Sequence, residues 1–265
     1  MTPYFREAGC GPAVLCLHSN ASTSGQWRSL MERLSGRFRV IAADAYGAGK
    51  SPDWPAGTPG WLDDELALLQ PLFEGIDGQF HLVGHSYGAA VALKAALRCG
   101  ERVASLSVYE PTLFALLLAQ DPDHPAAQGI RDAATDAATA VDRGDLNAAA
   151  ERFIDYWMGK GAWAAMPEPR RPAVAQSMRG IRYWAHALMN EPTPLAAFAR
   201  LDLPVLYLVG GRSPASSRGV FDVLSKALPD VRVEQFDGLG HMGPVTHPDL
   251  VNQAIERHVG IISRV

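Results

Sequence analysis

Ser86 lies in a pentapeptide whose residue types and spacing could perform nucleophilic chemistry. The segment Gly84-His85-Ser86-Tyr87-Gly88 follows an apolar run at residues 80–83 and precedes a helix-prone run at residues 89–98. A serine between a strand and a helix lies on a tight turn, where side chains at the flanking positions would collide, so glycine is required there. The turn raises the hydroxyl above the sheet edge and directs the N–H of Tyr87 toward a developing oxyanion. The pattern therefore predicts a nucleophilic Ser86 with Tyr87 as an oxyanion-hole donor.

A serine on such a turn must be positioned by a β-sheet, and short apolar runs predict the strands of that sheet. These runs are Ala13–Leu17, Arg39–Ala43, 80–83, Val103–Tyr109, 205–209 and Val231–Phe236. Continuous apolar runs are typical of parallel strands that are covered on both faces. Between the runs, apolar residues recur at helical spacing, as in Leu62, Leu66, Leu69 and Phe73. The alternation predicts an α/β fold with a mostly parallel sheet and helices on both faces, to which residues 4–8 could add an antiparallel edge strand.

The alternation stops after Tyr109, and residues 112–199 show no strand signal. This stretch is rich in alanine, is interrupted by several prolines, and is far too long for an ordinary loop. We interpret it as a helical cap that is inserted into a core domain formed by residues 1–111 and 200–265. Its aromatic residues are numerous, and we expect Trp157 and Trp184 to line a substrate pocket beneath it.

The sequence resembles the α/β-hydrolase superfamily over essentially its full length, specifically the serine-nucleophile hydrolases with a helical cap. The similar segments are Leu17-His18-Ser19-Asn20-Ala21-Ser22, Asp44-Ala45-Tyr46-Gly47-Ala48-Gly49-Lys50-Ser51, the pentapeptide around Ser86, and Gly240-His241-Met242-Gly243-Pro244. The resemblance implies that the backbone of Asn20 supplies the second oxyanion N–H. The family usually has His-Gly in that loop, whereas this chain has His18-Ser19. His18 and Met242 are further candidates for the substrate pocket.

A serine hydroxyl requires a general base within hydrogen-bond reach, and His241 is the best placed of the eight histidines. It follows the last predicted strand in a glycine-rich loop. It also preserves the family's chain order of serine, acid and histidine. We expect the remaining histidines to have structural roles, with local hydrogen bonds for His18 and His85.

The acid is where the chain departs from the family pattern. The family most often places an aspartate where this chain has Ser213, and a serine cannot supply the negative charge that stabilises a protonated imidazole. Some members, haloalkane dehalogenases among them, carry the acid after an earlier strand, and Glu110 matches that position. A carboxyl group directly after a buried strand also needs a partner. We favour Glu110 over a Ser-His dyad or an inactive site, over pairing of Glu110 with Arg212, and over Asp237 as the acid.

Serine at the elbow, rather than the aspartate of dehalogenases and epoxide hydrolases, implies acyl chemistry. We therefore expect a hydrolase that cleaves a carboxylester, lactone or related bond in a small to medium hydrophobic molecule through an acyl-enzyme on Ser86. The alternatives are a non-catalytic ligand-binding protein, a cofactor-free peroxidase-like enzyme, and a carbon–carbon bond hydrolase.

Composition narrows the remaining classes of function. The 265 residues carry a net charge of −4 without a basic cluster, which argues against nucleic acid as a partner. The longest aliphatic run, at residues 113–119, is too short to span a membrane, and the first residues do not resemble a secretory signal. Three cysteines indicate reduced thiols in a cytoplasmic protein.

Binding motifs for a cofactor or metal are also absent from the sequence. Residues 44–51 end in Gly49-Lys50-Ser51 like a phosphate-binding loop, but Asp44 replaces the first glycine and no helix signal follows. We therefore expect no cofactor, no metal and a small-molecule substrate. The sequence does not determine the oligomeric state, and a homodimer is one possibility.

Overall fold

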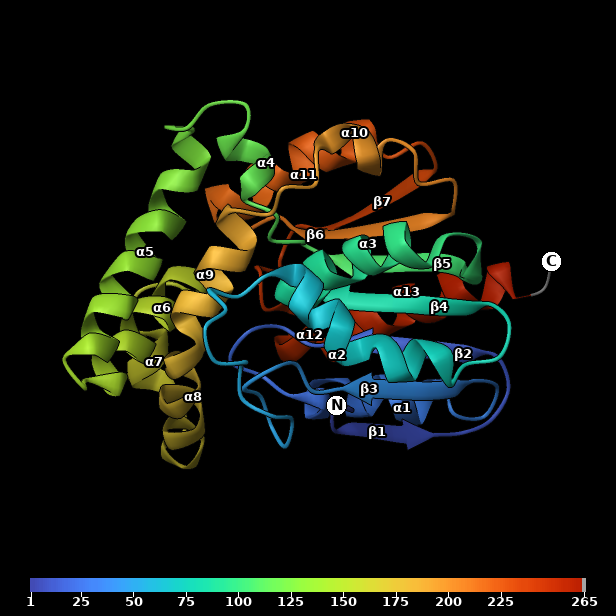
Figure 1. Cartoon of the computed structure of the whole chain (residues 1–265), viewed down its shortest axis with the longest axis horizontal. Helices are drawn as coiled ribbons and strands as arrows, with labels where there is room; N and C mark the ends of the chain where they lie inside the picture. Colours follow the sequence, from blue (N-terminus) through green and yellow to red (C-terminus); the bar gives the residue numbers. More distant parts are fainter. Residues whose placement is uncertain (264–265) are drawn as a thin grey trace.

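A seven-stranded sheet forms the centre of the molecule (Figure 1), a computed structural model that describes residues 1–263. The strand order is β1-β3-β2-β4-β5-β6-β7. β1 runs antiparallel to β3, and every other pair is parallel. The strands are β1 (Phe5–Ala8), β2 (Ala13–Leu17), β3 (Arg39–Ala43), β4 (Phe80–His85), β5 (Val103–Tyr109), β6 (Val205–Gly210) and β7 (Val231–Phe236). The mostly parallel α/β fold with an antiparallel edge strand is confirmed.

The burial of the strands follows their position in the sheet. β2, β4 and β6 are buried along their whole length, whereas the edge strand β7 contains only exposed and half-buried residues. Continuous apolar sequence in the inner strands therefore reflects helices on both faces. β4 extends two residues beyond the apolar run at 80–83 and ends at His85, directly before Ser86.

Two sets of helices cover the two faces of the sheet, each with its own group of buried residues. The first set contains α2 (Leu62–Glu74), α3 (Tyr87–Cys99) and α11 (Ala215–Ala227). The second set contains α1 (Arg28–Leu34) and α13 (Pro248–Ile262). Three short helical elements lie between strands and helices of the core, namely η1 (Ser24–Trp27), η2 (Gly100–Arg102) and α12 (Gly243–Thr246). No helix within residues 1–263 is both long enough and apolar enough to cross a membrane.

The chain between β5 and β6 contains helices and no strand, and the structure describes all of it. The longer helices of this segment gather at one end of the sheet (Figure 1). The elements are α4 (Ala115–Leu118), α5 (Pro125–Asp142), α6 (Leu146–Met158), α7 (Ala162–Ala165), η3 (Glu168–Arg170), α8 (Arg171–Ser177), η4 (Met178–Gly180), α9 (Ile181–Met189) and α10 (Leu195–Phe198). We refer to this segment as the cap.

A partly buried ion pair connects the end of the cap to the core. Lys94 Nζ, on α3, lies 2.5 Å from Glu191 Oε1 and 3.2 Å from Asp63 Oδ2. Lys94 also donates to Thr193 Oγ1 at 3.0 Å. Because α3 begins directly after Ser86, this contact fixes the exit of the cap to the helix that follows the predicted nucleophile.

Candidate active site

Ser86 adopts the strained turn that its sequence context predicts. It has φ 57° and ψ −117° between β4 and α3. A Cβ atom on Gly84 would lie 2.5 Å from the Cα of Ala89, and one on Gly88 would lie 2.3 Å from the carbonyl oxygen of Leu17. Neither position can hold a side chain, which explains the two glycines that flank the serine.

Ser86, His241 and Glu110 form a continuous chain of hydrogen bonds. Ser86 Oγ lies 2.8 Å from His241 Nε2, and His241 Nδ1 lies 2.6 Å from Glu110 Oε2. All three side chains are buried. Since Nδ1 faces a carboxylate and therefore carries the proton, Nε2 is free to accept the proton of the serine hydroxyl.

The Glu110 carboxylate is held by donors on both of its oxygens. Oε1 accepts from the backbone N–H of Gly210 at 2.7 Å and from Ser213 Oγ at 2.5 Å. The backbone of Glu110 has φ 46°, a conformation that is uncommon for a residue other than glycine and that here accompanies a fully buried carboxylate. Ser213, at the position usually held by the family's aspartate, thus donates a hydrogen bond to the acid that replaces it.

The other candidate arrangements for the acid do not occur in this structure. Asp237 is exposed and accepts a hydrogen bond from Gln235 at 2.7 Å. The Glu110 carboxylate bonds to His241, and Arg212 forms no ion pair with it.

Three side chains fix the loop that carries His241. His85 Nε2 donates to the carbonyl of His241 at 2.8 Å, and Tyr109 Oη donates to the carbonyl of Gly240 at 2.8 Å. Trp157 of the cap stacks on the imidazole of His241, with ring centroids 3.9 Å apart and an interplanar angle of 25°. Burial lowers the pKa of His85 well below 6.5, so that its second nitrogen remains an acceptor.

A network beneath the site joins the loop after β2 to the serine elbow. Gln26 Nε2 donates to His85 Nδ1 at 3.1 Å. Gln26 Oε1 accepts from the N–H of Ser19 at 3.2 Å and from its hydroxyl at 3.0 Å. Sequence reasoning expected local bonds for His85 but missed Gln26, because a glutamine 59 residues from its partner has no signature in the sequence.

The predicted oxyanion donors flank Ser86. Tyr87 is the first residue of α3, and its N–H has no acceptor within its own helix. Its phenol is held behind the site, where Oη donates to Glu65 Oε1 at 3.1 Å. Burial raises the pKa of Glu65 to about 7. Asn20 lies in the loop after β2 and lines both cavities that reach Ser86.

Two cavities of unequal size meet at Ser86. The inner cavity, of about 20 Å³, lies beneath the cap and has apolar walls, with Phe114, Phe153, Ile181, Trp184 and Leu188 among them. The outer cavity, of about 350 Å³, has His241, Met242, Val245 and Met166 among its walls. Four residues border both cavities, namely Trp157, Phe153, Asn20 and Ser86. Of the predicted pocket residues, Trp184 therefore lines the inner cavity, Met242 the outer one, and Trp157 both.

His18 lies outside these two cavities. Its Nδ1 donates to the carbonyl of Ser19 at 2.7 Å, and its Nε2 accepts from the N–H of Ala45 at 3.0 Å. It borders a separate small cavity with Asp44 and Glu65. The prediction that His18 lines the substrate pocket therefore finds no support in the structure, because both ring nitrogens serve the backbone of neighbouring loops.

The loop at residues 44–51 is held by its own carboxylate. Asp44 Oδ2 accepts from the N–H of Lys50 at 3.0 Å, and Oδ1 accepts from the N–H of Ser24 at 2.6 Å. The N–H of Lys50 therefore already has an acceptor within the loop, and the next helix, α2, begins only at Leu62. The segment is thus a structural turn.

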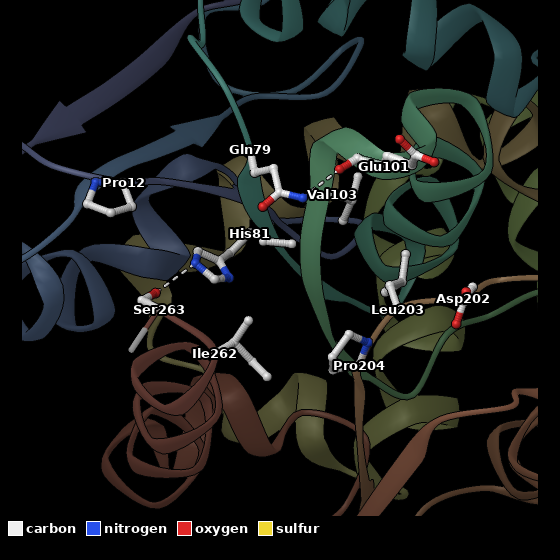
Figure 2. Close-up of a pocket in the computed structure, with 11 residues that line it drawn as sticks. Pro12, Gln79, His81, Glu101, Val103, Asp202, Leu203, Pro204, Ile262 and Ser263 are labelled. Atoms are coloured by element: carbon white, nitrogen blue, oxygen red, sulfur yellow. Dashed lines mark hydrogen bonds between the residues drawn. The ribbon is translucent and has the colours of Figure 1, made fainter. Parts of the chain in front are cut away.

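A larger cavity of about 700 Å³ lies at the opposite edge of the sheet (Figure 2). Its walls include Pro12, His81, Val103 and Pro204, which precede or begin β2, β4, β5 and β6. In parallel α/β sheets, ligands bind outside the carboxyl ends of the strands, the edge at which Ser86 lies. Within residues 1–263 no group of three metal-ligating side chains comes together.

Comparisons with known proteins identify the family to which this chain belongs. The model of the alpha/beta hydrolase family matches residues 14–254. A pimeloyl-[acyl-carrier protein] methyl ester esterase of Aeromonas hydrophila is 27% identical, with 95% of this chain and 97% of that protein covered. A 2-(acetamidomethylene)succinate hydrolase of Mesorhizobium japonicum is 28% identical, with 96% and 90% covered.

Solved structures show the same architecture. The crystal structure of an alpha/beta hydrolase from Sphaerobacter thermophilus superposes with a TM-score of 0.73 at 27% identity, and covers 98% of this chain and 95% of that one. Curated relatives include esterases and other hydrolases, which supports hydrolase activity at the level of the family. The chain is a member of the alpha/beta hydrolase family.

Proposed function

We propose that this protein is a serine esterase that cleaves a carboxylic ester, or a related acyl bond, through an acyl-enzyme on Ser86. The observation that carries the proposal is the hydrogen-bonded series Ser86, His241 and Glu110, with distances of 2.8 and 2.6 Å. These three groups have the arrangement that general-base activation of a serine requires.

The proposed reaction has two halves. His241 Nε2 takes the proton of Ser86 as Oγ attacks the carbonyl carbon, and the N–H groups of Tyr87 and Asn20 stabilise the oxyanion. His241 then returns the proton to the departing alcohol. Water, deprotonated by the same imidazole, then attacks the acyl carbon, and His241 returns this proton to Ser86 Oγ as the acid is released. Glu110 stabilises the imidazolium that forms in each half-reaction.

The two cavities support an assignment of the two parts of the ester. The alcohol must leave close to His241 Nε2, since this nitrogen protonates it, and His241 lines the outer cavity. The acyl group then occupies the much smaller inner cavity. We therefore infer a preference for esters that combine a short acyl group with a larger alcohol.

The bond between Ser213 and Glu110 favours the catalytic interpretation over a ligand-binding protein without activity. The non-catalytic interpretation depended on the absence of an acid at position 213. With Glu110 bonded to His241, the site has a carboxylate, and Ser213 donates to that carboxylate.

Labelling with a fluorophosphonate tests the proposal. The reagent is expected to modify Ser86 and no other residue, with the site identified by peptide mapping. Ser86→Ala should abolish both labelling and the hydrolysis of short-chain aryl esters. A folded protein that is neither labelled nor active on any ester or lactone would contradict the proposal.

Two matched ester series test the assignment of the cavities. One series lengthens the acyl chain of a benzyl ester, and the other enlarges the alcohol of a fixed acetate ester. We expect kcat/KM to fall steeply with acyl length but to tolerate or favour larger alcohols. The reverse order would contradict the assignment and leave the role of Ser86 intact.

A further inference from the structure

Glu65 is a buried carboxyl group that takes no part in the proposed reaction. It lies on α2, which packs beside α3 on one face of the sheet (Figure 1). Only 1% of its surface is exposed. Its Oε1 accepts from Tyr87 Oη at 3.1 Å and from the backbone N–H of Tyr46 at 3.3 Å.

A carboxyl group in this place is costly to the folded protein. Burial disfavours its charged form, and within residues 1–263 no lysine or arginine forms an ion pair with it. The other buried residues of α2 are all leucine or phenylalanine. A leucine in place of Glu65 would extend this apolar face without the cost. The role of the carboxyl group therefore lies in the two bonds that it accepts.

The bond from Tyr87 acts on the predicted oxyanion donor that follows the nucleophile. Tyr87 comes directly after Ser86 and begins α3, so its N–H has no acceptor within the helix. Its side chain is fully enclosed, and Glu65 holds the far end of it. A side chain fixed at both ends restrains the rotation of its own backbone, and thus the direction of the N–H. An oxyanion donor depends on that direction, because it must already point at the developing charge.

The bond from Tyr46 acts on the loop that carries the other predicted donor, Asn20. The N–H of Ala45, the residue before Tyr46, donates to His18 Nε2 at 3.0 Å. His18 Nδ1 in turn donates to the carbonyl of Ser19 at 2.7 Å, directly before Asn20. One carboxyl group is thus connected by hydrogen bonds to the segments that carry both predicted donors.

We propose that Glu65 is a positioning residue of the oxyanion hole, which holds the N–H groups of Tyr87 and Asn20 in place through the phenol of Tyr87 and the N–H of Tyr46. This inference rests on the proposed esterase function. Glu65 borders neither cavity that reaches Ser86. Its removal should therefore weaken the binding of the oxyanion but not of the ester. Because both half-reactions form an oxyanion, kcat should fall while KM stays constant.

Steady-state kinetics on a short-chain aryl ester tests the inference. Glu65→Leu removes both bonds and should lower kcat at least about tenfold. Glu65→Gln keeps a carbonyl oxygen that can accept both bonds, and should stay within about threefold of the wild type. Tyr87→Phe removes the phenol bond alone and should lower kcat at least about threefold. Combined with Glu65→Leu, it should add no further loss, since the bond is already absent.

A trifluoromethyl ketone supplies a measurement that a loss of stability alone would not change. It adds reversibly to Ser86 and places an oxyanion at the same N–H groups, so its Ki in Glu65→Leu should rise by the factor by which kcat falls. Glu74→Leu is the matched control, at the exposed end of the same helix. Leu72→Ala controls for lost stability, since Leu72 is buried near that end. Both controls should keep kcat and Ki.

A kcat and a Ki within about twofold of the wild type in Glu65→Leu would overturn the inference and leave the proposed function intact. An equal loss in Leu72→Ala would also overturn it, because the effect would then reflect stability. If Glu65→Leu does not fold, Tyr87→Phe decides, and an unchanged kcat in that variant would overturn the inference. Absence of ester hydrolysis by the wild type would instead overturn the proposed function.

Discussion

Two buried histidines at opposite edges of the same sheet show how a partner determines what an imidazole can do. At the carboxyl edge, His241 lies between Ser86 Oγ and a Glu110 carboxylate oxygen. At the amino edge, His81 lies 2.8 Å from Ser105 Oγ and 3.0 Å from Ser263 Oγ. Figure 2 shows the second of these contacts. Each imidazole is almost fully buried and bridges two side-chain oxygens.

The difference between the two histidines is one negative charge. Burial, with the nearby His258, lowers the pKa of His81 to about 4, and its two hydroxyl partners offer no charge to oppose this effect. At the other edge, the Glu110 carboxylate stabilises the positive charge that appears on His241 when it takes a proton. A similar bridge of hydrogen bonds thus keeps one histidine neutral and prepares the other to serve as a base.

The largest effect should follow from removing that charge. Glu110→Gln is expected to lower kcat/KM on a short-chain ester by about four orders of magnitude. The glutamine carbonyl can still accept from Gly210 and Ser213, but its amide must then face His241 Nδ1 as a donor and favour the wrong tautomer. Steady-state kinetics with the purified variant measures the loss.

Asp237→Asn is the matched control, since Asp237 is an exposed carboxylate near the same loop. It should retain nearly full activity. A loss of less than about tenfold in Glu110→Gln would indicate that the imidazole acts without a carboxylate. A large loss of activity in the control would indicate that Asp237, and not Glu110, is the catalytic acid.

A smaller effect is expected at the amino edge, and on stability rather than activity. The unfolded chain protonates His81 near pH 6.5, whereas the folded protein does so only near pH 4, so its contribution is present above pH 6.5 and is lost as the pH falls toward 4. The free energy of unfolding should therefore drop by up to about 3 kcal/mol more in the wild type than in His81→Gln. Urea unfolding at pH 7 and pH 4.5 measures the difference.

Glutamine can bond to hydroxyl groups but does not titrate, so the variant isolates the proton. The neighbouring His258 is present in both proteins, and its contribution cancels to first order. Equal pH dependence in the two proteins would mean that His81 accepts a proton in the folded state as readily as in the unfolded one.

The smallest effect should come from the second contact of His241 Nδ1. Ser217 Oγ lies 3.2 Å from this nitrogen, a longer and uncharged contact than the one to Glu110. Ser217→Ala should reduce kcat/KM by at most about threefold, since Glu110 alone holds the ring. A loss of a hundredfold or more would show that orientation by the hydroxyl matters as much as the charge.

The sequence predicted those features that spacing determines. The strands, the turn at Ser86 and the loop of His241 each have a local signature, and parallel topology brings their ends to one edge. Glu110 was predicted from the resemblance to family members that carry the acid after the earlier strand, and the structure adds that β5 and β6 are neighbours, with Tyr109 paired with Leu208. The residue after β5 must therefore lie close to the loop after β6.

Other features of the site depend on distances between loops, which no local pattern records. Three contacts join segments that are far apart in sequence. They are the bond from Gln26 to His85, the stacking of Trp157 on His241, and the bond from Ser213 to Glu110. His18 was expected in the pocket because of its position in the chain. Its two nitrogens in fact hold the backbone at Ser19 and Ala45.

The contact between Ser213 and Glu110 also has an evolutionary consequence. The side chains from the two strand ends meet at 2.5 Å, so a carboxylate at position 213 would lie beside the one that bonds to His241. An ancestor with acids at both positions would have placed two carboxyl groups in contact, and one of them would have kept a proton while the other remained ionised. Such an intermediate retains one negative charge beside the base, and either acid can then be lost. Single substitutions can thus transfer the acid from the end of one strand to the end of another. The position that no longer carries the acid can then acquire a different role.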